Sequence, residues 1–230
     1  MSDPLIDAQI EIYRRSFLEH GDSPRATFNA RRELQWLRFE RLVEPLRALV
    51  PGQRFSIHDV GAGLCDLHAY LVERGIEHDY SATEIVPEMI ELARRKYPGI
   101  DVESRDLLAD PPAARWDFVV TSGMFNLPGD VPLDAWRRFC EGMLERMFAM
   151  TTHAIAVNFL TSHRTFSDPT LFYLDPGELI AFSQQRLSRF VSVDHSYPLY
   201  EYTAVIVRPE RVSSAHPGEA FDKYLRQERR

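Results

Sequence analysis

Apolar and polar positions follow two different rhythms along this chain. In residues 5–20 and 26–49, apolar side chains recur every three or four positions, which is the spacing of one helix face. From residue 55 onward, short apolar runs alternate with amphipathic stretches of helical spacing. This change of rhythm predicts two N-terminal helices, followed by a region of alternating strands and helices.

The alternating region predicts an α/β fold. Strand–helix alternation is typical of a mostly parallel sheet that is covered by helices on both faces. The last two strands are joined by a short segment around Pro198, which is too short for a crossover helix, so we expect them to be antiparallel. The seven predicted strands occupy residues 55–60, 79–83, 101–104, 117–121, 154–159, 190–193 and 201–207, and the predicted helices between them occupy 66–73, 87–97, 133–150 and 176–185.

Composition and charge narrow the possible partners. The formal net charge is −7, with 34 acidic against 27 basic residues, which disfavours nucleic-acid binding. No apolar run reaches the roughly 18 residues of a membrane span, and Met1–Pro4 lacks the start of a secretory signal. The two cysteines, Cys65 and Cys140, have neither disulfide-framework nor metal-site spacing. We therefore expect a cytoplasmic protein that binds no metal, membrane or nucleic acid.

The candidate chemistry begins at a glycine-rich turn, Asp59-Val60-Gly61-Ala62-Gly63, between the first predicted strand and the next helix. Glycines at positions 61 and 63 allow a sharp bend and the close approach of a ligand. The amide groups that begin the following helix favour a carboxylate or phosphate. Glu84 lies 23 positions after Gly61, at the end of the second predicted strand, where an acid can bind a ribose. Together these features predict a nucleotide-type cofactor.

Two cofactors fit such a turn, a nicotinamide dinucleotide and S-adenosylmethionine. The dinucleotide fingerprint places a third glycine three residues after the second, where this chain has Asp66. A pyrophosphate is disfavoured beside the two acids Asp59 and Asp66, whereas a sulfonium with an ammonium group tolerates them. The acidic flank therefore favours S-adenosylmethionine.

At this point residues 55–207 resemble the class I S-adenosylmethionine-dependent methyltransferases. The resemblance implies a Rossmann-like fold and rests on residues 59–63, Glu84-Ile85, Asp106-Leu107, residues 117–126 and the closing antiparallel strand pair. The chain departs from the family pattern at Cys65, where many members have a third glycine.

The resemblance also implies site residues. In that family the glycine loop faces the methionine part of the cofactor, the acid matching Glu84 binds the ribose, and the residue matching Ile85 packs on adenine. The acid matching Asp106 contacts the adenine amino group, and residues 122–126 line the reacting centre. The cofactor-binding residues expected here are Asp59, Gly61, Ala62, Gly63, Glu84, Ile85, Asp106, Leu107, Ser122, Gly123 and Arg38.

We expect three segments: a helical lid over residues 1–50, the methyltransferase domain over 51–209, and a C-terminal tail over 210–230. An N-terminal helical segment lids the site in many members of this family, so we place residues 5–45 over the cofactor. Arg38 lies on the second predicted helix and would then meet the carboxylate of the cofactor.

The methyl acceptor is expected to be a small molecule that is methylated on oxygen or nitrogen. The chain has no Asn-Pro-Pro-Tyr-type sequence after the fourth predicted strand, where nucleic-acid amino-methyltransferases often have one. A hydroxyl acceptor needs a general base, for which His20 and Asn126 are the catalytic candidates. The residues expected to bind the acceptor are Tyr13, Phe125, Asn126, Asn158 and Tyr173.

Two alternatives remain open at this level. One is a methyltransferase-like module that binds the cofactor without turnover. The other is a nicotinamide-dependent oxidoreductase.

Overall fold

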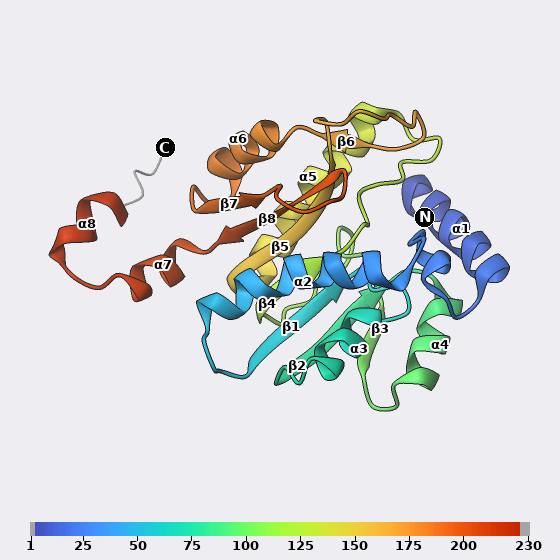
Figure 1. The fold of residues 1–230 in the computed structure, drawn as a ribbon, viewed down its shortest axis with the longest axis horizontal. Helices are drawn as coiled ribbons and strands as arrows, with labels where there is room; N and C mark the ends of the chain where they lie inside the picture. Colours follow the sequence, from blue (N-terminus) through green and yellow to red (C-terminus); the bar gives the residue numbers. More distant parts are fainter. Residues whose placement is uncertain (1–2, 226–230) are drawn as a thin grey trace.

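One mixed sheet organises the computed structural model, which describes residues 3–225 (Figure 1). The strand order is β3-β2-β1-β4-β5-β8-β7, with β6 paired to β5 beside this path. Strands β1 to β5 pair in parallel, and β8 runs antiparallel to both β5 and β7. The strands are β1 (Phe55–Val60), β2 (His78–Glu84), β3 (Asp101–Ser104), β4 (Trp116–Thr121), β5 (Thr151–Thr161), β6 (Tyr173–Leu174), β7 (Val191–Asp194) and β8 (Glu201–Val207).

The observed sheet confirms the expected fold class, with one addition. The seven predicted strands are present, and the closing pair is antiparallel as expected. Strand β6 was not predicted, because two residues are too few to show a period in the sequence. It pairs in parallel with the end of β5 at Leu160 and Thr161.

Helices cover both faces of the sheet. On one face of the sheet, α2 and α3 pack in a buried apolar cluster with β1, β4, β5 and β8. On the other face, α5 and α6 form a second apolar cluster with the same sheet. Figure 1 shows α2 crossing the strands, while α1 lies apart from it, near α4. The helical segments are α1 (Pro4–His20), η1 (Pro24–Thr27), α2 (Arg32–Leu49), α3 (Asp66–Glu73), α4 (Pro87–Lys96), α5 (Leu133–Met150), α6 (Pro176–Arg186), α7 (Pro209–Ala215) and α8 (Glu219–Leu225).

Helix α2 begins at Arg32, six residues later than the expected position 26. The short 3₁₀ turn η1 (Pro24–Thr27) covers the first of these positions, and Phe28 ends the turn with a left-handed φ of 58°. Since non-glycine residues rarely adopt that conformation, the helix cannot run through this point. The second predicted helix is therefore divided into a turn and a helix with different packing partners.

The C-terminal segment 210–230 was expected to be a tail. The structure gives helices α7 and α8, and the Arg211 guanidinium donates a hydrogen bond to the Leu49 carbonyl. Residues 226–230 of this prediction lie outside the described part of the chain. Over residues 3–225, every helix falls short of the length or apolar character needed to cross a bilayer.

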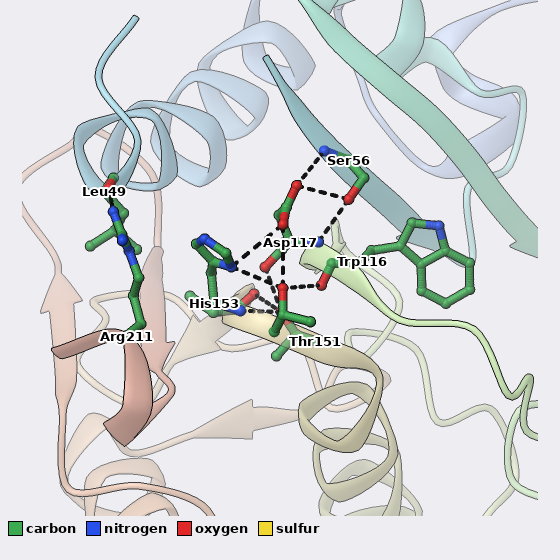
Figure 2. A network of polar contacts seen from close by, with 9 residues as sticks. Leu49, Ser56, Trp116, Asp117, Thr151, His153 and Arg211 are labelled. Carbon is green, nitrogen blue, oxygen red and sulfur yellow. Dashed lines mark hydrogen bonds and ion pairs between the residues drawn. The ribbon is translucent and has the colours of Figure 1, made fainter. Parts of the chain in front are cut away.

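A polar network joins three strands at their amino ends (Figure 2). The Asp117 carboxylate accepts hydrogen bonds from the Ser56 amide at 2.8 Å and from the Ser56 hydroxyl at 2.9 Å. The Thr151 hydroxyl donates to the Asp117 carbonyl at 2.7 Å, which ties β5 to β4. Asp117 therefore has a structural role at the end of the sheet that is opposite to Gly61 and Glu84.

Candidate active site

A cavity lies at the carboxyl ends of β1, β2 and β4, with about 800 Å³ of empty space that is partly open to solvent. Strand β1 has β2 on one side and β4 on the other, so the chain changes direction across the sheet at this point. Such a switch point is the usual ligand site of open parallel sheets. The predicted cofactor residues that line the cavity are Gly61, Gly63, Glu84, Ile85, Asp106, Leu107, Ser122 and Gly123.

Glu84 connects the glycine loop after β1 to the loop after β2, the two segments expected to bind a nucleotide-type cofactor. Its carboxylate is buried and accepts hydrogen bonds from the amides of Gly63 at 2.7 Å, Ile85 at 2.6 Å and Val86 at 2.9 Å. Burial raises the pKa of this carboxyl group, and the three amide donors act in the opposite direction. The acid therefore anchors the glycine loop to the end of β2, in addition to facing the cavity.

The glycine loop follows β1 with positive φ values, +66° at Gly61 and +57° at Gly63. A Cβ atom at Gly63 would lie 2.6 Å from the Thr27 methyl group, and one at Gly61 would lie 3.1 Å from the Met124 sulfur. Other parts of the chain therefore approach this loop closely, as only glycine permits.

The three amides of the glycine loop itself have hydrogen-bond partners within the chain. The Gly61 and Ala62 amides donate to the Thr83 carbonyl at 2.9 and 3.2 Å, and the Gly63 amide donates to Glu84. Ala62 is absent from the lining of the cavity. At Cys65, which replaces the family's third glycine, the backbone is left-handed with φ 56°. Cys65 thus adopts the left-handed backbone conformation that glycine adopts easily, and its Cβ atom makes this conformation strained.

Asp59 also lies outside the cavity lining, directly before the glycine loop. Its side chain is 4% exposed, and the Tyr80 hydroxyl donates to its Oδ2 at 2.9 Å. Burial raises the pKa of Asp59 to about 7, although the Tyr80 hydrogen bond acts to lower it. The acid that the sequence placed among the cofactor ligands is therefore a buried group beneath the loop.

This raised pKa makes stability depend on pH. Between about pH 4 and pH 7 the folded Asp59 keeps a proton that the unfolded chain has lost, so stability falls as pH rises. An asparagine side chain does not titrate, so the Asp59→Asn variant lacks this pH dependence. The free energy of unfolding of the variant, relative to that of the parent, should therefore rise by about 2 to 3 kcal/mol between pH 5 and pH 8. Urea unfolding at both pH values measures this rise. Tyr80→Phe removes the hydrogen bond that lowers the pKa of Asp59, so the loss of stability should continue to higher pH in that variant. A stability difference between Asp59→Asn and the parent that is the same at pH 5 and pH 8 would contradict the raised pKa of Asp59.

Asp66 has a partner that the sequence did not indicate. Lys96 Nζ lies 3.3 Å from its Oδ1, and Gln35 donates to its Oδ2 at 3.2 Å. The negative charge of Asp66, one of the two acids that disfavoured a pyrophosphate, is therefore partly balanced by the Lys96 ammonium group.

Arg38 does not reach the cavity, which corrects the expectation that it meets the cofactor. Its Nε donates to both carboxylate oxygens of Glu201, at 2.8 and 2.9 Å, and its Nη1 donates to the Asn29 side chain. Helix α2 packs on the sheet through buried Phe39 and Leu42, so it is part of the core instead of a lid. Within residues 3–50, the described part of the expected lid, only α1 and η1 line the cavity, through Ile6, Gln9, Tyr13 and Thr27.

The catalytic candidates are not at the cavity wall. His20 lies in the last turn of α1, with its ring 3.8 Å from the Glu19 carboxylate. Asn126 packs beside Gly123, and neither residue belongs to the lining. Both predictions rested on position after a strand or in a turn, which does not fix the direction of a side chain.

Of the five expected acceptor-binding residues, the structure brings only Tyr13 to the cavity. Phe125 is fully buried and stacks on Phe159 with ring centroids 4.8 Å apart. Asn158 is fully buried beneath the cavity wall, and the Tyr173 ring lies under the Arg164 guanidinium at 3.6 Å. Burial of Tyr13 raises the pKa of its hydroxyl, with Glu84 adding to the effect.

Other lining residues were missed by the sequence analysis. The amphipathic helix α5 places Trp136, Phe139 and Met143 on the wall, where its apolar face continues from the core. The apolar spacing of this helix was visible, but a periodic stripe does not separate core from cavity positions. The other lining residues that the expected site did not include are Ile6, Gln9, Thr27, Val60, Thr83 and Arg105. Met124 belongs to residues 122–126, which were expected to line the reacting centre, and it does line the cavity.

Comparisons with known proteins identify the family. No family model matches the chain. The chain is 30% identical over 163 residues to the Mycobacterium tuberculosis (strain ATCC 25618 / H37Rv) protein named "Putative methyltransferase Rv1506c", across 70% of this chain and 98% of that protein. The chain belongs to the class I S-adenosylmethionine-dependent methyltransferases.

Solved methyltransferase structures share the fold of this family member. The DhpI-SAM-HEP complex matches with a TM-score of 0.62 and 21% identity, over 91% of this chain and 100% of that one. Magnesium protoporphyrin IX methyltransferase (ChlM) from Synechocystis PCC 6803 matches with a TM-score of 0.61 and 14% identity, over 87% and 97% of the two chains. The N-methyltransferase NodS from Bradyrhizobium japonicum WM9 has a TM-score of 0.59 and 11% identity, over 87% and 98%. The methyltransferase architecture is thus retained at low sequence identity.

Proposed function

We propose that this methyltransferase binds S-adenosylmethionine in the cavity and transfers its methyl group to an oxygen or nitrogen of a small-molecule acceptor. The observation that carries the proposal is the Glu84 carboxylate, buried at the cavity wall and bonded to the glycine loop. The ChlM and DhpI structures were solved with bound S-adenosylmethionine, which supports the same cofactor here.

The lining residues fit an adenosyl cofactor. A carboxylate offers about four acceptor directions, and backbone amides use three of them at Glu84, which leaves one for a ribose hydroxyl. Asp106 Oδ1 accepts from the Leu108 amide at 2.9 Å, which holds this second acid at the cavity edge. Ile85 and Leu107 supply apolar surface next to these acids, as an adenine ring requires.

S-adenosylmethionine, when bound, supplies an electrophilic methyl group. The residues of this chain would then bind the cofactor, orient the acceptor and exclude water, since proximity is the main contribution a protein makes to such a transfer. The wall formed by Ile6, Met124, Trp136 and Phe139 provides the apolar part of the enclosure.

Among the described residues that line the cavity there is no histidine, and the raised pKa of Tyr13 keeps its hydroxyl protonated. An acceptor that arrives with its lone pair free, such as a neutral amine or an ionised hydroxyl, therefore suits this wall better than one that needs a general base. The charge of the chain, −7, supports a small molecule over a nucleic acid as acceptor.

Titration calorimetry tests the proposal. We expect S-adenosylmethionine and S-adenosylhomocysteine to bind with Kd values on the order of micromolar, and NAD to bind at least about 100-fold more weakly. Binding of NAD in preference to S-adenosylhomocysteine would favour the oxidoreductase alternative. Cofactor binding without methyl transfer to any of a panel of amines, phenols and carboxylic acids would favour the silent binding module.

A further inference from the structure

A buried carboxylate at the start of β8, Glu201, does not line the cavity described above. It is 2% exposed, and the Arg38 guanidinium binds both of its oxygens. A buried ion pair of this kind contributes little to stability compared with an apolar pair of the same shape, but removing one partner is costly. Its contacts indicate a different role.

Glu201 fixes the orientation of the Asn158 amide. Asn158 Nδ2 donates to Glu201 Oε2 at 2.8 Å, and Asn158 Oδ1 accepts from the Gly123 amide at 2.8 Å. A carboxylate only accepts hydrogen bonds, so it draws the NH₂ group toward itself and turns the amide oxygen toward Gly123. Gly123, the second residue after β4, lines the cavity and has a φ of +77°.

The same ion pair also reaches a second wall of the cavity, formed by η1 and the glycine loop. Arg38 Nη1 donates to the Asn29 side-chain oxygen, and Asn29 Nδ2 donates to the carbonyl and the hydroxyl of Thr27, both at 3.1 Å. Thr27 lines the cavity, and its methyl group meets the glycine loop at Gly63. A continuous series of side-chain hydrogen bonds therefore links the two walls.

We propose that Glu201 is a positioning residue of the site. Through Asn158 it holds Gly123 and the loop after β4 in place, and through Arg38 and Asn29 it holds Thr27 against the glycine loop. This inference rests on the proposed function, in that these walls enclose the cofactor. The sequence separation of 163 residues between Arg38 and Glu201 shows that the pair joins distant parts of the chain at one point.

Two single variants and their combination test the Asn158 arm. In Glu201→Gln, an NH₂ group faces Asn158 Nδ2, so the Asn158 amide turns over and the Gly123 amide loses its acceptor. In Asn158→Asp, two carboxylates meet in a buried site. The double variant Glu201→Gln/Asn158→Asp restores one donor, one acceptor and a single negative charge, so it should rescue both defects.

The readouts are amide hydrogen exchange of the segment 122–126 and calorimetric binding of S-adenosylhomocysteine. Each single variant should exchange faster by about tenfold or more and bind about tenfold more weakly, and the double variant should return to within about threefold of the parent. Arg137→Gln, at the exposed α5–α6 ion pair with Glu178, is the matched control and should behave like the parent. Unchanged exchange at 122–126 in folded single variants, or no rescue in the double variant, would overturn the proposal.

Asn29→Ala tests the other arm and does not depend on the folding of a buried-charge variant. It should weaken S-adenosylhomocysteine binding about threefold and speed exchange in residues 24–29, with the segment 122–126 unaffected. No change in residues 24–29 would reject this arm. A parent protein that fails to bind S-adenosylhomocysteine would overturn the proposed function, while the exchange data would still decide the positioning role of Glu201.

Discussion

Glu84→Ala is expected to weaken S-adenosylhomocysteine binding by at least about 100-fold, because the substitution has two separate effects at the cavity. It removes the acceptor that we assign to the ribose. It also leaves the amides of Gly63, Ile85 and Val86 without their partner, and each unsatisfied buried donor costs about 1 to 3 kcal/mol. Calorimetry at 25 °C measures the first effect, and urea unfolding measures the second.

Glu84→Gln separates the two effects. The amide oxygen can still accept from Ile85 and Val86, but the NH₂ group then faces the Gly63 amide, donor against donor. Binding should fall with a smaller loss of stability than in Glu84→Ala. Glu91→Ala, at an exposed acid on α4, is the matched control. If Glu84→Ala bound S-adenosylhomocysteine within about threefold of the parent, the ribose assignment would be rejected.

The parts of the molecule that depend on local pattern could be predicted from the sequence. The strands that carry the site, the glycine turn and Glu84 follow from apolar spacing and backbone chemistry over a few residues. Ser122 and Gly123, which the family resemblance implied, line the cavity; they follow β4, and parallel strands end at the same edge of the sheet.

The misplaced residues depend on long-range packing. The partner of Arg38 lies at Glu201, and no local pattern distinguishes an arginine that pairs across the core from one that binds a ligand. Phe125 follows β4 and Asn158 lies within β5, near its carboxyl end, but Phe125 packs into the core and Asn158 bonds beneath the wall. Position along a strand predicts which edge a residue reaches, whereas side-chain direction depends on neighbours from other elements.

Gly63→Ala is expected to weaken S-adenosylhomocysteine binding by about tenfold or more, and by more than Gly61→Ala does. The new methyl group would lie 2.6 Å from the Thr27 methyl, and the backbone at φ +57° disfavours any side chain. The obstacle at Gly61 is milder, because the Met124 sulfur at 3.1 Å belongs to a flexible side chain that can move aside. Calorimetry on both variants gives the ranking.

Thr27→Ser identifies which of the two causes acts at Gly63. It removes the methyl group that the new Cβ would meet but keeps the hydroxyl that accepts from Asn29 and donates to the Pro24 carbonyl. In the Thr27→Ser background, Gly63→Ala should therefore lose only part of its effect, since the backbone strain remains. An effect of equal size in both backgrounds would show that η1 does not press on the glycine loop. Partial rescue would mean that η1 packs directly against the glycine loop after β1. Glycine would then be required at position 63 because the Thr27 methyl group occupies the space of a side chain there.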